Sequence, residues 1–193
     1  MKIVFHEDFK CTDYASNGAS VPGRMEVIIT ALVKEGRYEV VSPEPALYED
    51  LARAHFRTHI ADIAKDARLF KMASLAAGGA ILASEIAFKG EPTFACIRPP
   101  GHHASRNSTW GYCAFCNMGI AILKLKEKGL IENAFVLDFD AHKGDGNVDV
   151  LSEWENIKIL NPMAGNNKNY LKEIEDYIFN IQHVDMVAVS AGF

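Results

Sequence analysis

The chain has 193 residues, of which 49% are hydrophobic and 23% are charged. This composition excludes a disordered tail, a coiled coil and a collagen-like repeat, and the length suits a single domain over residues 1–193. The 20 basic and 25 acidic residues give a formal charge of −5 without a basic stripe, so we expect no direct binding to nucleic acid.

Short apolar runs alternate with longer helical patterns along the chain. Strands are predicted at residues 2–5, 38–41, 93–97, 134–139, 157–160 and 184–190. Helices are predicted at residues 22–34, over a broken region at 43–88, and at 115–128 and 170–182. Continuous apolar strands separated by helices indicate a three-layer α/β fold, in which a parallel sheet carries helices on both faces.

The start of the chain and its cysteines favour a cytoplasmic protein. The polar residues at 6–8 interrupt the first apolar run, so we expect no signal peptide. The longest apolar stretch, residues 73–88, contains serine and glutamate and favours a buried helix over a membrane span. Four cysteines are too few for a disulfide scaffold in a chain of this size, so we expect reduced thiols and no membrane partner.

Two carboxylates and an imidazole follow a predicted buried strand at Asp138, Asp140 and His142. Residues two apart on extended backbone point the same way, so the three side chains share one side of the strand end. Carboxylates this close repel each other unless a cation or hydrogen-bond donors compensate, and zinc or Fe(II) accepts these ligands. The alternative is a solvated, Asp-rich turn. Gly144 and Gly146 are expected to allow a sharp turn after the ligands.

Two adjacent histidines, His102 and His103, lie in a Gly- and Pro-rich loop after the predicted strand at 93–97. From the loop alone they are metal ligands, acid and base groups, or a polar surface. Metal-assisted hydrolysis needs a base for the attacking water and an acid for the leaving amine, which favours the second reading beside the Asp/His cluster. Each imidazole would need a carboxylate to fix its tautomer, and Asp138 and Asp145 are the candidates.

Three segments together resemble the histone deacetylase and acetylpolyamine amidohydrolase family. They are Arg-Pro-Pro-Gly-His-His-Ala at 98–104, Gly-Tyr-Cys-Ala-Phe-Cys-Asn at 111–117, and Asp-Phe-Asp-Ala-His at 138–142, followed by Gly-Asp-Gly at 144–146. Weaker matches lie at 22–24 and 190–193. The resemblance implies an arginase-like α/β fold and a zinc-dependent amidohydrolase. Its substrate would be an acylated amine, such as acetyl-lysine or an acetylpolyamine, from which it removes an acetyl or another short acyl group.

The resemblance also implies roles for the residues of the site. His102 and His103 match the tandem catalytic histidines of the family, with Asp138 behind the first and Asp145 behind the second. His103 would take a proton from water and deliver one to the amine, while His102 helps to hold the charge.

The metal and the substrate are assigned in the same way. Asp140 and His142 match the first two metal ligands, while Gly111 and Tyr112 match the wall of the narrow tube that holds the acylated chain. Oxygens of residues 138, 140 and 142 would also supply a structural potassium site, and Arg24 matches an arginine near an internal channel.

The chain departs from the family pattern at several positions. Lys143 stands where the family usually has a second histidine, and Cys116 stands where asparagine is usual. The resulting Cys113-x-x-Cys116 motif is interpreted as site wall and core, since a thioredoxin-like motif would open a helix near the chain start. No serine stands near residues 159–160 to help hold potassium.

The largest departure concerns the third metal ligand. In the family an aspartate follows the Ser-Ala-Gly-Phe segment, whereas this sequence ends with Phe193, and a later tyrosine that polarises the substrate carbonyl is also outside it. The family inserts two later strands between the third and the fourth. The sequence therefore resembles the first part of a deacetylase domain, for which we expect self-association or a complementary C-terminal polypeptide. The alternative is a catalytically incomplete remnant or subunit that acts as a binding protein.

Overall fold

The computed structural model describes residues 1–15, 20–163, 167–181 and 183–191. Its strands are β1 (Lys2–Val4), β2 (Glu39–Val41), β3 (Thr93–Ala95), β4 (Ala134–Asp138), β5 (Ile157–Leu160) and β6 (Met186–Ser190). Its helices are the 3₁₀ helix η1 (Glu7–Lys10), α1 (Arg24–Lys34), α2 (Tyr48–Ala52), α3 (Arg57–Ile63), α4 (Ala67–Phe88), α5 (Asn117–Glu127), α6 (Asp145–Leu151) and α7 (Asn167–Asn180). Residues 182 and 192–193, which belong to the predicted last helix and to the weaker family match, lie outside the described residues.

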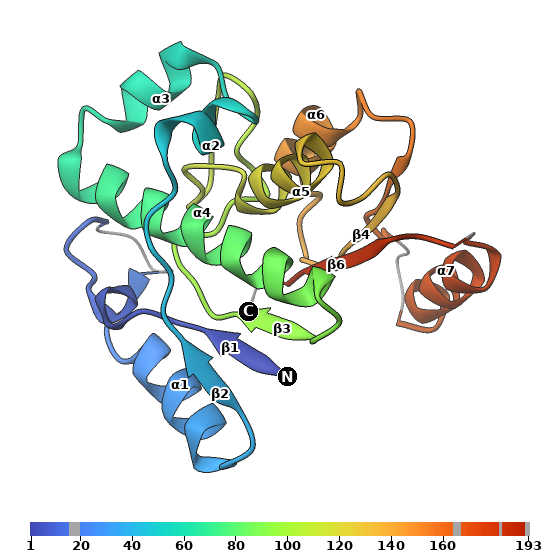
Figure 1. Ribbon diagram of the computed structural model, residues 1–193, viewed down its shortest axis with the longest axis horizontal. Helices are drawn as coiled ribbons and strands as arrows, with labels where there is room; N and C mark the ends of the chain where they lie inside the picture. Colours follow the sequence, from blue (N-terminus) through green and yellow to red (C-terminus); the bar gives the residue numbers. More distant parts are fainter. Residues whose placement is uncertain (16–19, 164–166, 182, 192–193) are drawn as a thin grey trace.

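All six strands pair in parallel, as their continuous apolar sequences predict (Figure 1). They form two three-stranded sheets, ordered β2-β1-β3 and β5-β4-β6. In the first sheet Val4 pairs with Val41 and Ala95, and in the second Val136 pairs with Ile159 and Ala188. Within the described residues no ladder joins the two sheets. Strand β4 is paired on both edges, with β5 and β6, so strands expected between the third and the fourth would adjoin β3 and β6.

The first sheet lies between α1 and α4. Ile3 and Phe5 of the β1 segment cluster with Met25 and Ile29 of α1 on one face. Val4 points to the other face, where the absence of a side chain at Gly79 lets α4 approach it closely. A Cβ at Gly79 would lie 2.7 Å from Ile97 Cγ2, so this glycine permits tight packing of helix on sheet.

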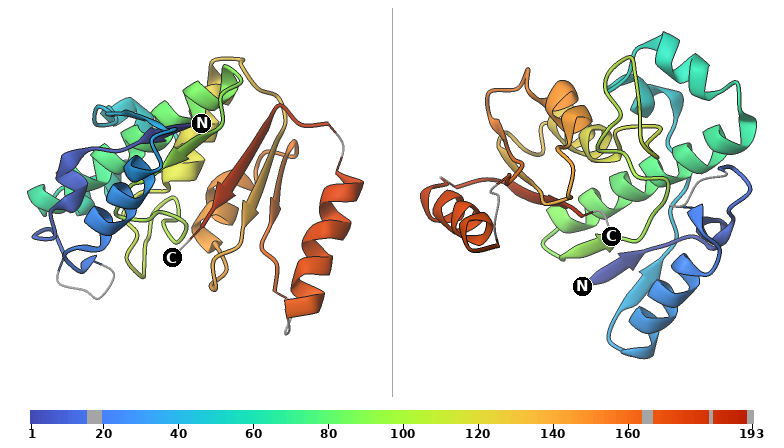
Figure 2. Two further views of the ribbon diagram at one scale, coloured as in Figure 1. Left: turned by 90° about the horizontal axis from the view of Figure 1, so that it is seen from below. Right: turned by 180° about the vertical axis from the view of Figure 1, so that it is seen from behind.

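The second sheet is covered on both faces, but unevenly (Figure 2). Ala134 and Val136 of β4 belong to the large core shared with α5 and α6. On the opposite face the ring of Phe135 stacks on Tyr177 of α7, with centroids 5.1 Å apart. Val187 of β6, which pairs with Phe135 in the ladder, is 58% exposed because α7 does not reach this strand.

Helix α4 is longer than the apolar stretch from which it was predicted. Asp66 caps it by accepting hydrogen bonds from the backbone N–H groups of Arg68 and Leu69, which sets its start six residues earlier. By length and composition alone this helix could cross a membrane. More than half of its most apolar window is buried in the protein, and it packs against α5, β1 and β3, so its apolar composition is that of a core helix.

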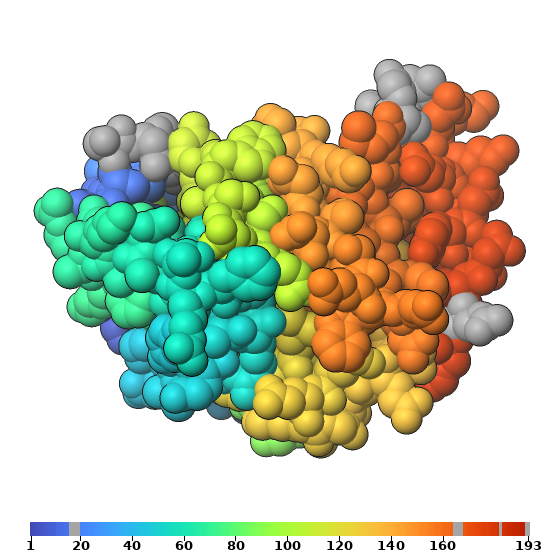
Figure 3. Space-filling model, turned by 90° about the horizontal axis from the view of Figure 1, so that it is seen from above, coloured from blue at the N-terminus to red at the C-terminus, as the bar shows by residue number. Residues whose placement is uncertain are grey.

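The segments that follow β3 and β4 lie side by side on one surface (Figure 3). The loop after β3 begins with Arg98, a buried residue whose guanidinium donates to the carbonyl oxygens of Phe9, Lys10 and Cys11. The side-chain amide of Asn117 donates to the carbonyl of Pro99 at 3.0 Å. These bonds fix both ends of the loop that carries the two adjacent histidines.

Candidate active site

Helix α6 holds the histidine loop against the end of β4. The backbone N–H groups of Gly146 and Asn147 donate to the carbonyl oxygen of His102 at 2.8 and 3.2 Å. A Cβ at Gly146 would lie 2.5 Å from the backbone nitrogen of Ala104, so only glycine permits this approach. The sequence predicts a sharp turn here and no helix, because glycine in a first turn disfavours a helix. Gly146 is nevertheless accommodated in α6, since its missing side chain makes room for Ala104.

Glycine is required at position 144 for a different reason from the one expected. Neither Gly144 nor Gly146 has a positive φ, so neither is needed for a left-handed backbone conformation in the turn expected after the ligands. A Cβ at Gly144 would lie 1.9 Å from Asp138 Oδ2. The glycine is required because the chain passes directly over this carboxylate, while its own N–H donates to Asn161 Oδ1 at 2.7 Å.

The inner histidine pair consists of His102 and Asp138. His102 Nδ1 donates to Asp138 Oδ2 at 3.3 Å, and the carboxylate is fully buried. The same oxygen accepts a hydrogen bond from Asn147 Nδ2 at 2.9 Å. Asn147 is itself fully buried, and its Oδ1 accepts from the Cys116 thiol at 3.3 Å. This carboxylate is therefore held by two side-chain N–H donors in the protein interior.

The outer histidine pair consists of His103 and Asp145. His103 Nδ1 donates to Asp145 Oδ1 at 2.7 Å. The second oxygen, Oδ2, accepts from Trp110 Nε1, also at 2.7 Å. His103 is buried, whereas the side chain of Asp145 is 46% exposed at the start of α6.

The two imidazoles lie against each other and share an acidic environment. Their ring centroids are 3.9 Å apart, with 42° between the planes. Burial lowers the pKa of His102, but the hydrogen bond to Asp138 and the charges of Asp138, Asp140 and Asp145 outweigh it, so the pKa is raised. For Asp145, burial raises the pKa, but the hydrogen bonds from His103 and Trp110 outweigh it, so the pKa is lowered.

The predicted metal ligands Asp140 and His142 lie next to each other beyond the end of β4. Asp140 Oδ1 is 3.2 Å from His142 Nδ1 and accepts from the backbone N–H of His142 at 2.7 Å. His102 Nε2 lies 3.8 Å from the same oxygen. Two such donors fit part of a tetrahedral zinc site, which needs three protein ligands and a water. In the part of the chain that the structure describes, no group of three or more His, Cys, Asp or Glu side chains is arranged to hold an ion.

The predicted tube residues Gly111 and Tyr112 follow the loop back past His103. Gly111 has φ +63°, and a Cβ there would lie 3.1 Å from His103 Cδ2. Tyr112 is 50% exposed beside it. The backbone of Gly111 thus flanks the outer histidine, and the wall role of both residues stays a prediction. Arg24, the predicted channel arginine, begins α1.

Cys113 and Cys116 are buried beneath the site. The Cys113 sulfur accepts from the backbone N–H of His103 at 3.4 Å. Burial raises the pKa of both thiols to about 12, which opposes formation of the thiolate. Their surroundings match the interpretation as site wall and core, since a redox-active motif needs an accessible thiolate.

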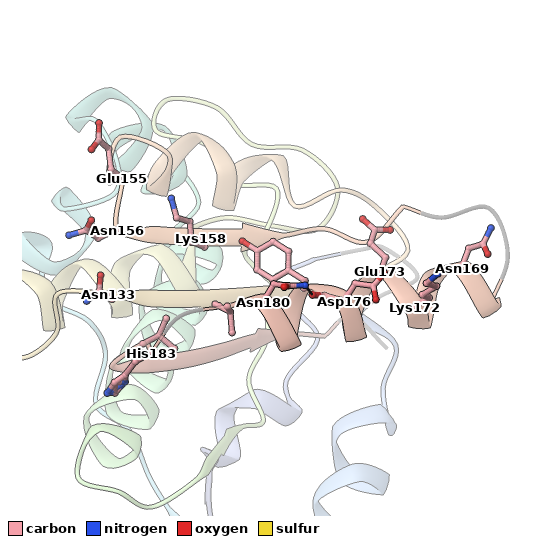
Figure 4. A pocket seen from close by; sticks show the side chains of 13 residues that line it. Asn133, Glu155, Asn156, Lys158, Asn169, Lys172, Glu173, Asp176, Asn180 and His183 are labelled. Atoms are coloured by element: carbon pink, nitrogen blue, oxygen red, sulfur yellow. Dashed lines mark hydrogen bonds between the residues drawn. The ribbon is translucent and has the colours of Figure 1, made fainter.

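A separate cleft of about 1040 Å³ lies between α7 and the second sheet (Figure 4). Asn133, Asn156 and Lys158 line its sheet side, and Glu173, Asp176 and Tyr177 line its helix side. None of the predicted catalytic or metal residues lines it. The chemistry-bearing side chains are therefore gathered at the ends of β3 and β4, apart from this cleft.

Two contacts of the site were not anticipated from the sequence. Trp110 lies in the Gly- and Pro-rich loop, where no local pattern indicates a hydrogen bond to a residue 35 positions away. Asn147 had no signal either, because its helix was not predicted.

A parallel α/β fold with tandem histidines, each paired to its own aspartate, defines the class of this protein. Residues 19–170 match the histone deacetylase domain, and the chain belongs to that family. Its fold is that of the crystal structure of the HDA15 HD domain, with a TM-score of 0.84, 20% identity, and coverage of 100% of this chain and 74% of that one.

Curated relatives include several deacetylases. A probable deacetylase of Archaeoglobus fulgidus is 31% identical over 77% of this chain and 47% of its own length. The histone deacetylase-like amidohydrolase of Pseudomonas aeruginosa is 30% identical over 64% of this chain and 37% of its length. The polyamine deacetylase HDAC10 of Rattus norvegicus is 28% identical over 75% of this chain and 30% of its length. The matched part of the chain spans at most about half of each of these relatives.

Proposed function

We propose that this chain carries the histidine and first metal-binding parts of a zinc-dependent amidohydrolase that removes an acetyl or other short acyl group from an acylated amine. The observation that carries the proposal is the pair of adjacent imidazoles, His102 and His103, each bonded through Nδ1 to its own aspartate. This bonding leaves Nε2 of each ring to act on a substrate. Relatives named as polyamine deacetylases support an amine substrate, either an acylpolyamine or an acyl-lysine.

The proposed metal site uses Asp140 and His142 as two of its donors. A bound zinc ion, or Fe(II) with the same ligands, would polarise the amide carbonyl and lower the pKa of the attacking water. The third donor comes from outside the described residues. A structural potassium ion held by oxygens of residues 138, 140 and 142 is a further element of the proposal.

The proposed reaction breaks the amide C–N bond with one water molecule. His103 takes a proton from the water as its oxygen bonds to the acyl carbon, and then delivers that proton to the departing amine nitrogen. His102, whose raised pKa favours the protonated form, holds positive charge beside the developing oxyanion. The products are a short carboxylic acid and a free amine.

The metal assignment predicts that Asp140→Ala lowers the zinc content of the purified chain. Asp140 is one of only two proposed donors, so its loss leaves a single imidazole and weak affinity. Metal analysis after dialysis against a fixed zinc concentration measures the change, with Asp176→Ala on α7 as the control carboxylate. Equal zinc content in the wild type and Asp140→Ala would exclude this assignment.

We further propose that the partner of this chain is a complementary polypeptide that supplies strands between β3 and β6. Each of these strands pairs along one edge in the described residues, and Val187 and Val189 of β6 are 58% and 50% exposed. Free edges and exposed apolar side chains favour association. The four unpaired cysteines support a reducing compartment such as the cytoplasm.

The activity of the chain alone tests both proposals. We expect residues 1–193 to release little or no amine from an acetylated lysine peptide or an acetylpolyamine, because they offer two metal donors. Adding the complementary polypeptide should restore zinc affinity and turnover together. Robust zinc-dependent deacetylation by the 193-residue monomer would overturn the need for a partner. If the restored complex binds zinc but hydrolyses neither substrate, the alternative of a binding protein holds.

A further inference from the structure

The ring of His103 is enclosed between two other rings. His102 lies on one side, with centroids 3.9 Å apart, and Trp110 stacks on it with centroids 3.6 Å apart and 29° between the planes. Trp110 immediately precedes Gly111, whose φ of +63° lets the backbone pass close to the edge of His103. The plane of this imidazole is thus set by contacts as well as by its hydrogen bond.

The indole also contacts the partner of His103. Trp110 Nε1 and His103 Nδ1 each lie 2.7 Å from Asp145, one from each carboxylate oxygen. An indole N–H only donates, so this bond requires an acceptor and cannot reverse its polarity. Without the indole, the second oxygen of this carboxylate, whose side chain is 46% exposed, would accept hydrogen bonds from mobile water molecules.

The inner carboxylate also accepts from a second side chain, although both of its donors share one oxygen, Oδ2. Asp138 accepts from His102 and from Asn147 Nδ2, just as Asp145 accepts from His103 and from Trp110 Nε1. In the interior an amide suffices, because the carboxylate is already enclosed. At the surface the second donor must also shield the pair, and an indole does both because it carries one N–H on a large apolar ring.

We propose that Trp110 is a positioning residue for the His103–Asp145 pair: its N–H fixes the carboxylate and its ring face fixes the imidazole plane. The catalytic consequence rests on the proposed function, because it requires His103 to act as the base. The hydrogen bonds themselves do not depend on the proposed function. Two measurements therefore separate the inference from the function on which it builds.

The first measurement follows the indole N–H by NMR. The chain contains two tryptophans, and the ring of the second, Trp154, lies beneath the ammonium group of Lys126 in α5. In Trp154→Phe the single indole N–H should resonate downfield and exchange slowly with solvent. Asp145→Ala in that background should move it upfield and speed its exchange. An unchanged indole signal in a variant whose other amide signals show a folded chain would overturn the proposal.

The second measurement uses the complex that turns over. Trp110→Phe keeps a ring against His103 but lacks the N–H, so kcat should fall about tenfold while KM changes by less than about twofold. Trp110→Ala should lower kcat further, and Trp154→Phe should match the wild type. A rise in KM alone for both Trp110 variants would overturn the positioning role in favour of a substrate wall. If Trp154→Phe and the wild type are both inactive, the proposed function fails while the NMR result still decides the hydrogen bond.

Discussion

The two histidine–aspartate pairs of this protein use the same groups in opposite surroundings. Asp138 ends a buried strand and has a fully buried side chain, whereas Asp145 opens α6 and is 46% exposed. The buried pair has the longer hydrogen bond, 3.3 Å against 2.7 Å. Sequence neighbours in one loop, His102 and His103, therefore receive different electrostatic environments from carboxylates that belong to different elements.

The difference indicates a division of labour. Three carboxylates raise the pKa of His102 despite its burial, which favours a ring that keeps its proton. His103 is bonded to a carboxylate whose own pKa is lowered and which stays ionised, while its ring is covered on both sides. This contrast agrees with the proposal that His102 holds charge while His103 moves the proton.

Replacing each histidine in turn should give the largest difference between the two pairs, measured as kcat. We expect His103→Ala to lower kcat by at least about 10²-fold, as loss of a general base does, and His102→Ala to lower it less or to shift the pH profile. The assay is amine release by the complex that turns over, with the exposed His183→Ala as control. Near-wild-type turnover in His103→Ala would rule out its assigned role.

Replacing each of the two carboxylates should lower the free energy of unfolding by different amounts. Asp138→Ala leaves the buried N–H groups of Asn147 and His102 without an acceptor, which should lower the free energy of unfolding by about 1–3 kcal/mol. Asp145→Ala opens a half-exposed position where water can replace the carboxylate as acceptor for His103 and Trp110, and should lower the free energy of unfolding by less, about 0.5–1 kcal/mol. Urea unfolding at pH 7 measures both. Equal losses would show that burial does not distinguish the pairs.

His55 is a buried histidine with no carboxylate partner among the described residues, and its effect on stability should depend on pH in a way that the two paired histidines do not share. Burial, with a smaller contribution from the adjacent His59, lowers the pKa of His55 from 6.5 to about 3. The folded state therefore keeps this ring neutral while the unfolded chain takes up a proton below about pH 6.5. Stability present at neutral pH should be lost as the pH falls from about 6.5 towards 3, by about 1.4 kcal/mol per unit.

Urea unfolding at pH 6.5, 5.5 and 4.5 would check this slope. His55→Gln should reduce the loss per pH unit, whatever its effect at pH 7, while His183→Gln, at an exposed histidine, should leave the slope unchanged. An identical slope in His55→Gln and the wild type would assign the acid sensitivity to other groups.

The sequence predicted most of what local patterns control. Strand β5 has the predicted bounds, residues 157–160, because its apolar run ends at polar residues on both sides. The adjacency of His102 to Asp138 and of His103 to Asp145 came from the family resemblance, and the structure places these pairs in contact. The catalytic roles stay predictions.

Features that depend on contacts distant in sequence were missed. Gly146 and Gly144 suggested a turn, whereas their missing side chains make room for Ala104 and Asp138. Trp110 reaches a partner 35 residues away, and no periodicity encodes such a bond. Local propensity cannot reveal a glycine or an indole whose role is set by another element.

The two sheets each contribute one part of the candidate site. The histidines follow a strand of the first sheet and the carboxylates follow a strand of the second, while α4 packs against α5 to hold the halves together. The distance of 3.3 Å between His102 Nδ1 and Asp138 Oδ2 is already near the limit of a hydrogen bond, so a separation of a few tenths of an ångström would break it. The hydrogen bond of the inner pair therefore depends on how closely the two sheets are held together by the packing of α4 against α5.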